Sequence, residues 1–120
     1  MKAFSTANVA RLSLEALKLR LATINSKATK TFWSVNSTDS SSDLQVDYKL
    51  RNFTKTWQFL NEVAGLAHEM RHHPTITTTY NKVHILLTTH DVGNHITESD
   101  TSLADKIHEI YGSKYEVDKN

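Results

Sequence analysis

The chain has 120 residues, of which 38% are hydrophobic and 22% are charged, and its formal net charge at pH 7 is +1. This length fits one domain, and no stretch approaches the roughly 18 consecutive apolar residues of a membrane-spanning helix. Because the chain has no cysteine, disulfides, thiolate nucleophiles, iron–sulfur clusters and cysteine-containing zinc sites are excluded. The seven histidines are therefore the main candidates for proton transfer or metal binding near neutral pH.

The beginning of the chain is basic. Residues 1–38 contain six Lys/Arg and a single acid, Glu15, whereas residues 39–120 contain eight Lys/Arg and twelve acids. An acid-poor, Ser/Thr-containing basic start is typical of mitochondrial import signals, so residues 1–10 are expected to be a basic N-terminal extension with a targeting role. A cytoplasmic location is the alternative. Direct nucleic-acid binding is not expected, because the remainder has no basic patch with interleaved aromatic residues.

The first predicted elements are a helix and a hairpin. A helix is expected over residues 11–29, with Ser13 as its N-cap. Residues 31–35 are typical of a strand, and apolar and polar residues alternate over 44–50, as in a half-buried strand. The polar residues 36–42 between them predict a turn. Four apolar residues at helical spacing are expected to be the buried stripe of the helix: Leu14, Leu17, Leu21 and Ile24.

The longest helix signal runs from Asn52, a suitable N-cap, to His72, and Pro74 is expected to end it. Counting 100° per residue places His68 and His72 together at the flank of the sheet-facing side. A helix that is apolar on two sides needs a partner for the second side, so a homodimer or homotetramer is predicted. The first stripe is Phe53, Trp57, Leu60, Ala64 and Ala67, and the second is Phe59, Val63, Leu66 and Met70.

Residues 75–90 are rich in β-branched side chains and predict a second hairpin that turns at 80–82. A capping-box pattern at 97–100 begins the last helix, and residues 116–120 are expected to be a disordered tail. The predicted fold is α+β, a four-stranded antiparallel sheet with three helices packed on one face in the order α-β-β-α-β-β-α. Val83, Ile85, Leu87 and Thr89 are expected to share one face of this hairpin, and the last helix is expected to have an apolar stripe formed by Leu103, Ile107 and Ile110.

One short motif suggests metal chemistry. Residues 68–72 (HEMRH) match H-E-x-x-H, in which two histidines one helical turn apart bind zinc and the glutamate acts as general base. The motif also needs a third ligand and an open zinc position, and here His73 and Pro74 interrupt the helix where it would have to continue. A zinc hydrolase is therefore an alternative, and no metal site is expected.

A longer pattern resembles the pterin-4a-carbinolamine dehydratase family. It comprises His72-His73-Pro74, residues 80–85 (YNKVHI), residues 88–90 (TTH) and Asp100, which opens a helix. The resemblance extends from about Arg11 to Tyr111, and it includes Trp33 at the end of the first strand and the passage YKLRNF at 48–53. In this signature an ionisable residue precedes the first histidine of the pair by four positions, and His68 supplies it. Residues 11–115 are accordingly expected to form a dehydratase-like domain.

The resemblance implies loss of water from a 4a-hydroxytetrahydropterin to give a quinonoid dihydropterin, without a metal or organic cofactor, as in tetrahydrobiopterin recycling. Imidazoles suit this reaction, since one proton must be given to the departing oxygen and one taken from a ring nitrogen. By the resemblance, His72 and His90 are the acid–base pair and His73 holds the pterin and assists. Three further residues are implied at the substrate site, although each also has an ordinary structural interpretation: His68 at a helix edge, Trp33 in the core and Asp100 as a helix cap.

The chain departs from the family pattern in two places. Thr75-Ile76-Thr77 stands where acidic and aromatic residues are usual, and the stretch between His90 and Asp100 is one residue longer than in animal-type members, with His95 inside it. These departures are expected to affect substrate affinity more than the class of reaction. Some family members bind and dimerise a transcription factor, so a non-enzymatic binding role is the main alternative function. His84 is expected on the sheet surface.

Overall fold

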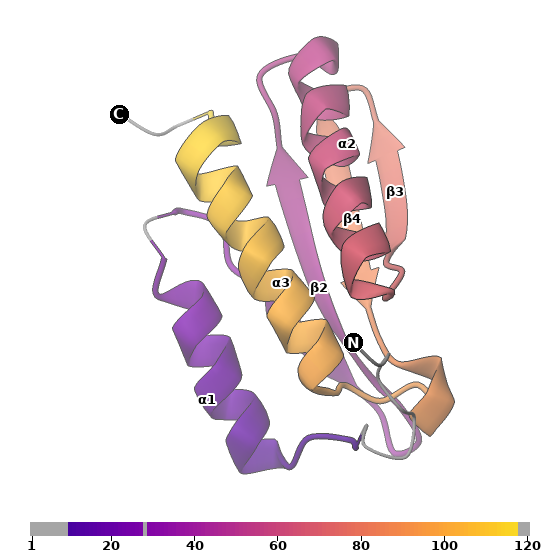
Figure 1. Ribbon diagram of the computed structural model, residues 1–120. Coiled ribbons are helices and arrows are strands. Elements are labelled where there is room, and N and C mark those ends of the chain that lie inside the picture. Colours follow the sequence, from indigo (N-terminus) through magenta and orange to yellow (C-terminus); the bar gives the residue numbers. More distant parts are fainter. Residues whose placement is uncertain (1–9, 28, 118–120) are drawn as a thin grey trace.

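The computed structural model describes residues 10–27 and 29–117, which form three helices over a four-stranded antiparallel sheet (Figure 1). The α+β class and the predicted order of elements are confirmed. The long elements are α1 (Leu14–Asn25), β1 (Ser34–Ser37), β2 (Ser42–Lys49), α2 (Phe53–Met70), β3 (Thr75–Thr79), β4 (Lys82–Leu87) and α3 (Glu98–Ile110). Two short helices were not predicted: a 3₁₀ turn, η2 (His90–Val92), and a π-helical turn, η3 (Tyr111–Tyr115), which continues α3.

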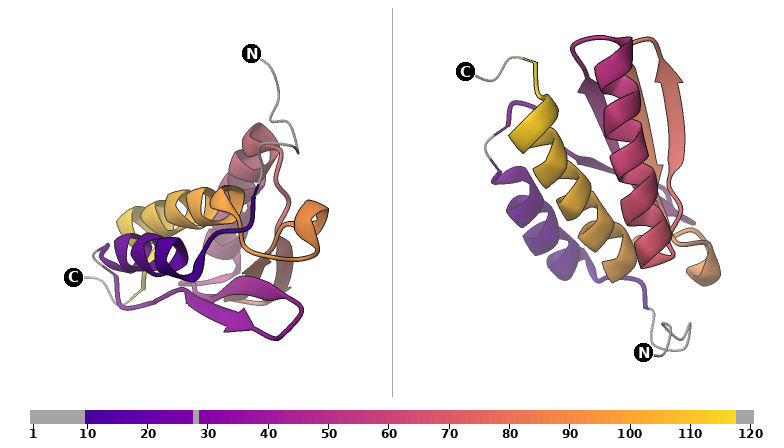
Figure 2. Two further views of the ribbon diagram at one scale, coloured as in Figure 1. Left: turned by 90° about the horizontal axis from the view of Figure 1, so that it is seen from below. Right: turned by 45° about the horizontal axis from the view of Figure 1, so that its top comes forward.

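The strands lie in the order β1-β2-β4-β3, and every neighbouring pair is antiparallel. All three helices cover the same face of this sheet, with α3 between α1 and α2 (Figure 2). The central strands β2 and β4 come from different hairpins. The two hairpins therefore pair side by side in the sheet, with Val46 of β2 opposite Ile85 of β4.

The core lies between the sheet and the helices. The predicted alternation is confirmed, since side chains at every second position of β2 and β4 are buried and their neighbours face the uncovered side of the sheet. Thr89, just beyond β4, is also buried, at 7% exposure. The strand residues that fill the core are Leu44, Val46, Tyr48, Val83, Ile85 and Leu87, and α3 adds Leu103 and Ile107.

The three predicted helix caps are present. The side chains of Ser13 and Asn52 accept hydrogen bonds from backbone N–H groups of the first turns of α1 and α2. Thr97 and Asp100 form a reciprocal capping box at the start of α3. The expected burial of Leu14 is wrong, because this first residue of α1 is 66% exposed, whereas Leu17 and Ile24 are buried.

The expected sheet-facing side of α2 is wrong in part. The buried side combines residues from both predicted stripes with the polar Thr56, whereas Phe53 and Trp57 are 57% and 45% exposed. The helix also ends earlier than expected, at Met70, because Arg71 adopts a left-handed conformation with φ 56°. His72 therefore lies beyond the helix and does not share its face with His68.

Neither terminus is described completely. Residues 1–9 of the expected N-terminal extension and residues 118–120 of the expected tail lie outside the described residues. The carboxylate of Glu116 accepts hydrogen bonds from the hydroxyl of Thr29 and the backbone N–H of Lys30. Within the described part of the chain, no helix has both the length and the apolar character needed to cross a membrane.

Candidate active site

Three of the predicted site residues line one hollow. His72 and His73 lie between α2 and β3, and His90 lies just beyond β4. Because β3 and β4 are antiparallel, with Thr75 opposite Leu86, the residues before β3 lie beside the residues after β4. The hollow there has a volume of about 140 Å³, and it is lined by Arg71, His72, His73, Thr88, Thr89, His90 and Asp91.

A buried carboxylate holds the first of these histidines. The side chain of Asp100 is fully buried at the start of α3, and its Oδ1 lies 2.5 Å from Nε2 of His72. Its other oxygen, Oδ2, accepts hydrogen bonds from the hydroxyl of Thr89 at 2.7 Å and from the backbone N–H of Thr97 at 2.8 Å. The Thr97 hydroxyl lies 2.7 Å from that of Thr89 and completes the network.

This network determines which nitrogen of His72 is available. An ionised carboxylate only accepts hydrogen bonds, so Nε2 of His72 carries the hydrogen that Oδ1 of Asp100 accepts. Nδ1 is then the nitrogen left for a ligand in the hollow. A carboxylate in this place also holds the ring in one orientation.

His90 is held by a different kind of group. Its Nδ1 lies 2.6 Å from the side-chain Oδ1 of Asn94, four residues further along the same loop. An amide oxygen only accepts hydrogen bonds, so Nδ1 of His90 is the donor. The two histidines therefore differ in their partners, an anionic carboxylate for His72 and a neutral amide for His90.

His73 and His68 share a second, larger hollow next to the first. It has a volume of about 570 Å³ and is lined by His68, Glu69, Arg71 and His73. Arg71 and His73 border both hollows, which therefore form one continuous surface. The structure thus brings four of the six predicted site residues to this surface and places Asp100 directly behind it.

Trp33 is not brought to this surface. It is 2% exposed and packs edge-on against Tyr48, with its Nε1–H donating to the Tyr48 hydroxyl at 2.9 Å. That hydroxyl also contacts Nδ1 of the buried His108 at 2.7 Å. Burial raises the pKa of Tyr48 well above its ordinary value, although the hydrogen bond from Trp33 acts in the opposite direction. Trp33 belongs to a polar network of the core, in keeping with its ordinary structural interpretation.

Sequence reasoning missed Thr89, Thr97 and Asn94 as members of the site. The sequence predicts Thr97 as a helix cap and includes Thr89 in the TTH motif and on one face of a strand. Neither prediction places these hydroxyls beside Asp100, where the structure has them. The extra residue between His90 and Asp100 was the feature of the sequence that could have indicated Asn94. As predicted for a sheet-surface residue, His84 lies on the uncovered face of the sheet, where its Nδ1 contacts Oδ1 of Asp47 at 2.8 Å.

The geometry does not suit the zinc motif. The motif requires both histidines on one face of one helix, but α2 ends at Met70 and Nε2 of His72 is engaged by Asp100. Among residues 10–27 and 29–117, no group of three or more His, Asp or Glu side chains is arranged to hold a metal ion.

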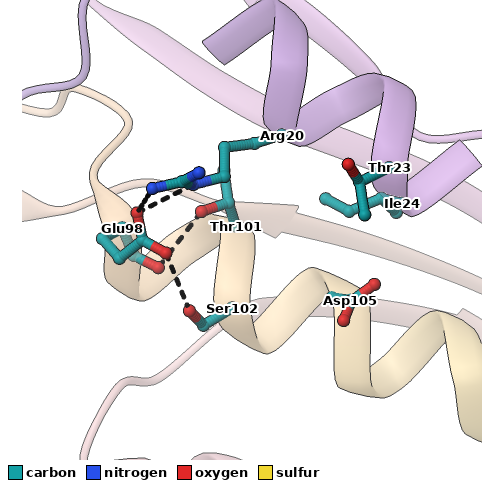
Figure 3. A pocket seen from close by; sticks show the side chains of 7 residues that line it. All are labelled: Arg20, Thr23, Ile24, Glu98, Thr101, Ser102 and Asp105. Carbon is teal, nitrogen blue, oxygen red and sulfur yellow. Dashed lines mark hydrogen bonds and ion pairs between the residues drawn. The ribbon is translucent and has the colours of Figure 1, made fainter. Parts of the chain in front are cut away.

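Another hollow, of about 310 Å³, lies between α1 and α3 (Figure 3). Its charged side chains already have partners, since Arg20 donates twice to Glu98 and Lys27 lies 3.2 Å from Asp105. None of its lining residues is a histidine. The clustered imidazoles therefore make the surface at the end of α2 the better candidate for an active site.

The chain is also similar to known proteins over most of its length. A family model described as pterin 4 alpha carbinolamine dehydratase matches residues 11–110. A relative from Thermomicrobium roseum, named as a candidate pterin-4-alpha-carbinolamine dehydratase, is 54% identical over 63 residues, which cover 52% of this chain and 67% of the relative. A relative of the same name from Chloroflexus aggregans is 41% identical over 80 residues, which cover 67% of this chain and 81% of the relative.

A solved structure is also similar. The crystal structure of a transcriptional coactivator/pterin dehydratase from Brucella melitensis matches with a TM-score of 0.69 and 25% sequence identity. The match covers 84% of this chain and 98% of the Brucella chain. Nearly the whole of that protein therefore has its counterpart in the fold described above.

Proposed function

Because the chain belongs to the pterin 4 alpha carbinolamine dehydratase family, as its sequence motifs predicted, we propose that it eliminates water from a 4a-hydroxytetrahydropterin. The observation that carries this proposal is the convergence of His72, His73 and His90 on one hollow, with His72 held by the buried Asp100. Asp100 therefore acts on the substrate through His72 in this proposal, which differs from the direct contact expected from the sequence.

The elimination needs two proton transfers. A proton is donated to the hydroxyl oxygen as its bond to C4a breaks, and this oxygen leaves as water. The proton on the ring nitrogen bonded to C4a is removed, and the electron pair of that N–H bond forms the new double bond to C4a in the quinonoid product. His72 and His90 are the pair that donates and accepts, and each well-placed group contributes about 10²–10⁴ in rate.

The pterin is proposed to lie across the continuous surface of the two hollows. His73 borders both of them and is suited to contact the pterin ring where it passes from one hollow to the other. His68 lies at the far edge of this surface, where it would contact the substrate away from the reacting carbon.

A rate measurement tests the function. The purified full chain is added to 4a-hydroxytetrahydropterin, and formation of the quinonoid product is followed against the buffer-catalysed rate. We expect a clear acceleration that His72→Ala and His90→Ala each reduce by about 10²-fold or more. His84→Ala is the matched control, because this histidine lies on the uncovered face of the sheet and should leave the rate unchanged.

A non-enzymatic binding role is the second candidate. The exposed aromatic pair Phe53 and Trp57 on α2, with ring centroids 6.4 Å apart, favours it as a protein-binding feature. The same assay separates the two functions, since a folded protein that does not exceed the buffer rate would leave binding as the better explanation.

Mitochondrial import is proposed from the basic start of the chain alone. Deleting residues 1–10 and following the location of the protein tests this proposal. If the location does not change, residues 1–10 have no targeting role.

A further inference from the structure

The loop after β4 brings an amide group back onto His90. Gly93 and Asn94 both adopt left-handed backbone conformations, with φ 73° and φ 64°. Two such residues in succession reverse the direction of the chain after η2, so the side chain of Asn94 faces the ring of His90 at 2.6 Å. Asparagine suits this position, because it tolerates the left-handed region better than most residues and also supplies a hydrogen-bond acceptor.

The backbone of Asn94 is fixed on both sides. Its N–H donates to the carbonyl of Thr89 at 3.1 Å, and its carbonyl accepts from the N–H of Ser42 at 2.9 Å. Ser42, the first residue of β2, also accepts from the Thr88 hydroxyl at its carbonyl and from the Ile96 N–H at its own hydroxyl. The acceptor beside His90 is therefore held by the first residue of the central strand β2.

We propose that Asn94 is a positioning residue that fixes the tautomer of His90, so that Nε2 is the nitrogen through which His90 exchanges protons; this rests on the proposed dehydratase function. The Asn94 amide oxygen accepts from Nδ1–H, which leaves the lone pair of the neutral ring on Nε2. His72 has the opposite arrangement, with Nε2 bound to Asp100 and Nδ1 available. The two rings thus present different nitrogens to one substrate.

The tautomer is measured directly by ¹⁵N NMR of the histidine side chains in the unliganded full chain, at a pH where the rings are neutral. We expect His90 to carry its hydrogen on Nδ1 in the wild type and to mix both tautomers in Asn94→Gly. Glycine is the clean replacement, because it keeps the left-handed backbone and removes only the amide. His84 is the internal control, since its contact with Asp47 is remote from this loop and its signals should not change.

Kinetics supply the second readout. Asn94→Gly should lower kcat by about 10-fold or more, because the group that orients a catalytic histidine is lost. Asn94→Asp should keep the Nδ1–H tautomer and recover most of kcat. Its pH–rate profile should move to higher pH, because a carboxylate beside the ring stabilises the imidazolium. A residue with only a structural role would not shift the profile.

The proposal is overturned if wild-type His90 carries its hydrogen on Nε2, or if Asn94→Gly changes neither the tautomer nor kcat. If the wild type shows the expected tautomer but no catalysis, the dehydratase function is overturned. The role of Asn94 in orienting the His90 ring would then still stand. Thermal unfolding of both variants separates these outcomes from a general loss of folding.

Discussion

The hydroxyl of Tyr48 and Nδ1 of His108, which are 60 residues apart in the chain, lie 2.7 Å from each other in the core. Trp33 donates to the Tyr48 oxygen, so the Tyr48 O–H donates to His108 and requires a neutral ring there. Burial lowers the pKa of His108 from its ordinary value of 6.5, and nearby Lys27 acts in the same direction. The Thr31 backbone and the carboxylates of Glu116 and Asp105 oppose this shift.

Stability should therefore decrease in mild acid. The unfolded chain takes up a proton at His108 below about pH 6.5 that the folded chain does not, so the stabilisation is fully present above this pH and is lost as the pH falls. His108→Asn removes the titrating ring, so the slope of the free energy of unfolding against pH should decrease by up to about 1.4 kcal/mol per pH unit. Urea unfolding between pH 7.5 and about 5 measures this slope, with His84→Ala, a half-buried histidine on the uncovered face of the sheet, as control. Equal slopes in wild type and His108→Asn would contradict the prediction.

Asp100→Asn tests the partner of His72. The amide retains one oxygen that can accept from the Thr97 N–H, so the helix cap can persist while the negative charge beside the imidazole is lost. We expect kcat to fall by about 10²-fold or more, with a small change in the thermal midpoint. Glu98→Gln removes a charge from the same helix turn at an exposed site paired with Arg20, and it should retain full activity. Similar rates for the two variants would show that Asp100 does not assist His72.

Thr89→Val tests the support of the carboxylate itself. Valine has nearly the same shape as threonine but lacks the hydroxyl that donates to Asp100, and it leaves the Thr97 hydroxyl without this neighbour. The free energy of unfolding should fall by about 1–3 kcal/mol, and kcat should fall less than in Asp100→Asn because the Thr97 N–H still holds Oδ2. Denaturant unfolding and the rate assay measure the two effects. A Thr89→Val rate as low as that of Asp100→Asn would contradict this ranking.

Trp57→Glu tests self-association through α2. The exposed side of this helix carries Phe53 and Trp57, and burying such a pair between copies of the chain is the simplest way to remove it from water. We expect sedimentation analysis to show an oligomer for the wild type and a smaller species for the variant. Gln58→Glu places the same charge on the neighbouring exposed position and should leave the mass unchanged. A wild type that sediments as a monomer would rule out this interface.

Gly65→Ala tests the stability of the same helix. Gly65 lies in the interior of α2, and an added Cβ would meet no atom within 4 Å. Alanine should therefore raise the free energy of unfolding by about 0.5–1 kcal/mol, because it loses less backbone entropy than glycine on folding. The reverse change at the adjacent exposed position, Ala64→Gly, should lower it by a similar amount. A loss of stability in Gly65→Ala would indicate a neighbour on this side of the helix.

The order of the long helices and strands and the inward face of β2 could be predicted from the sequence alone. The alternation over 44–50 and the caps at Ser13, Asn52 and Thr97 act between residues close in the chain, so local pattern was sufficient. The family motif also identified the three histidines around the hollow, since their residue types and spacing were unusual in combination.

Tertiary packing fixes which side of α2 is buried and where the helix ends, since both depend on the surface that the helix packs against and on the left-handed turn at Arg71. It also decided the partners of the histidines. Asp100 reaches His72 only after α3 docks on the sheet, and Trp33 is bonded to Tyr48 in the core. Hydrogen bonds between distant elements depend on distances that packing sets, and periodicity along the chain contains no information about those distances.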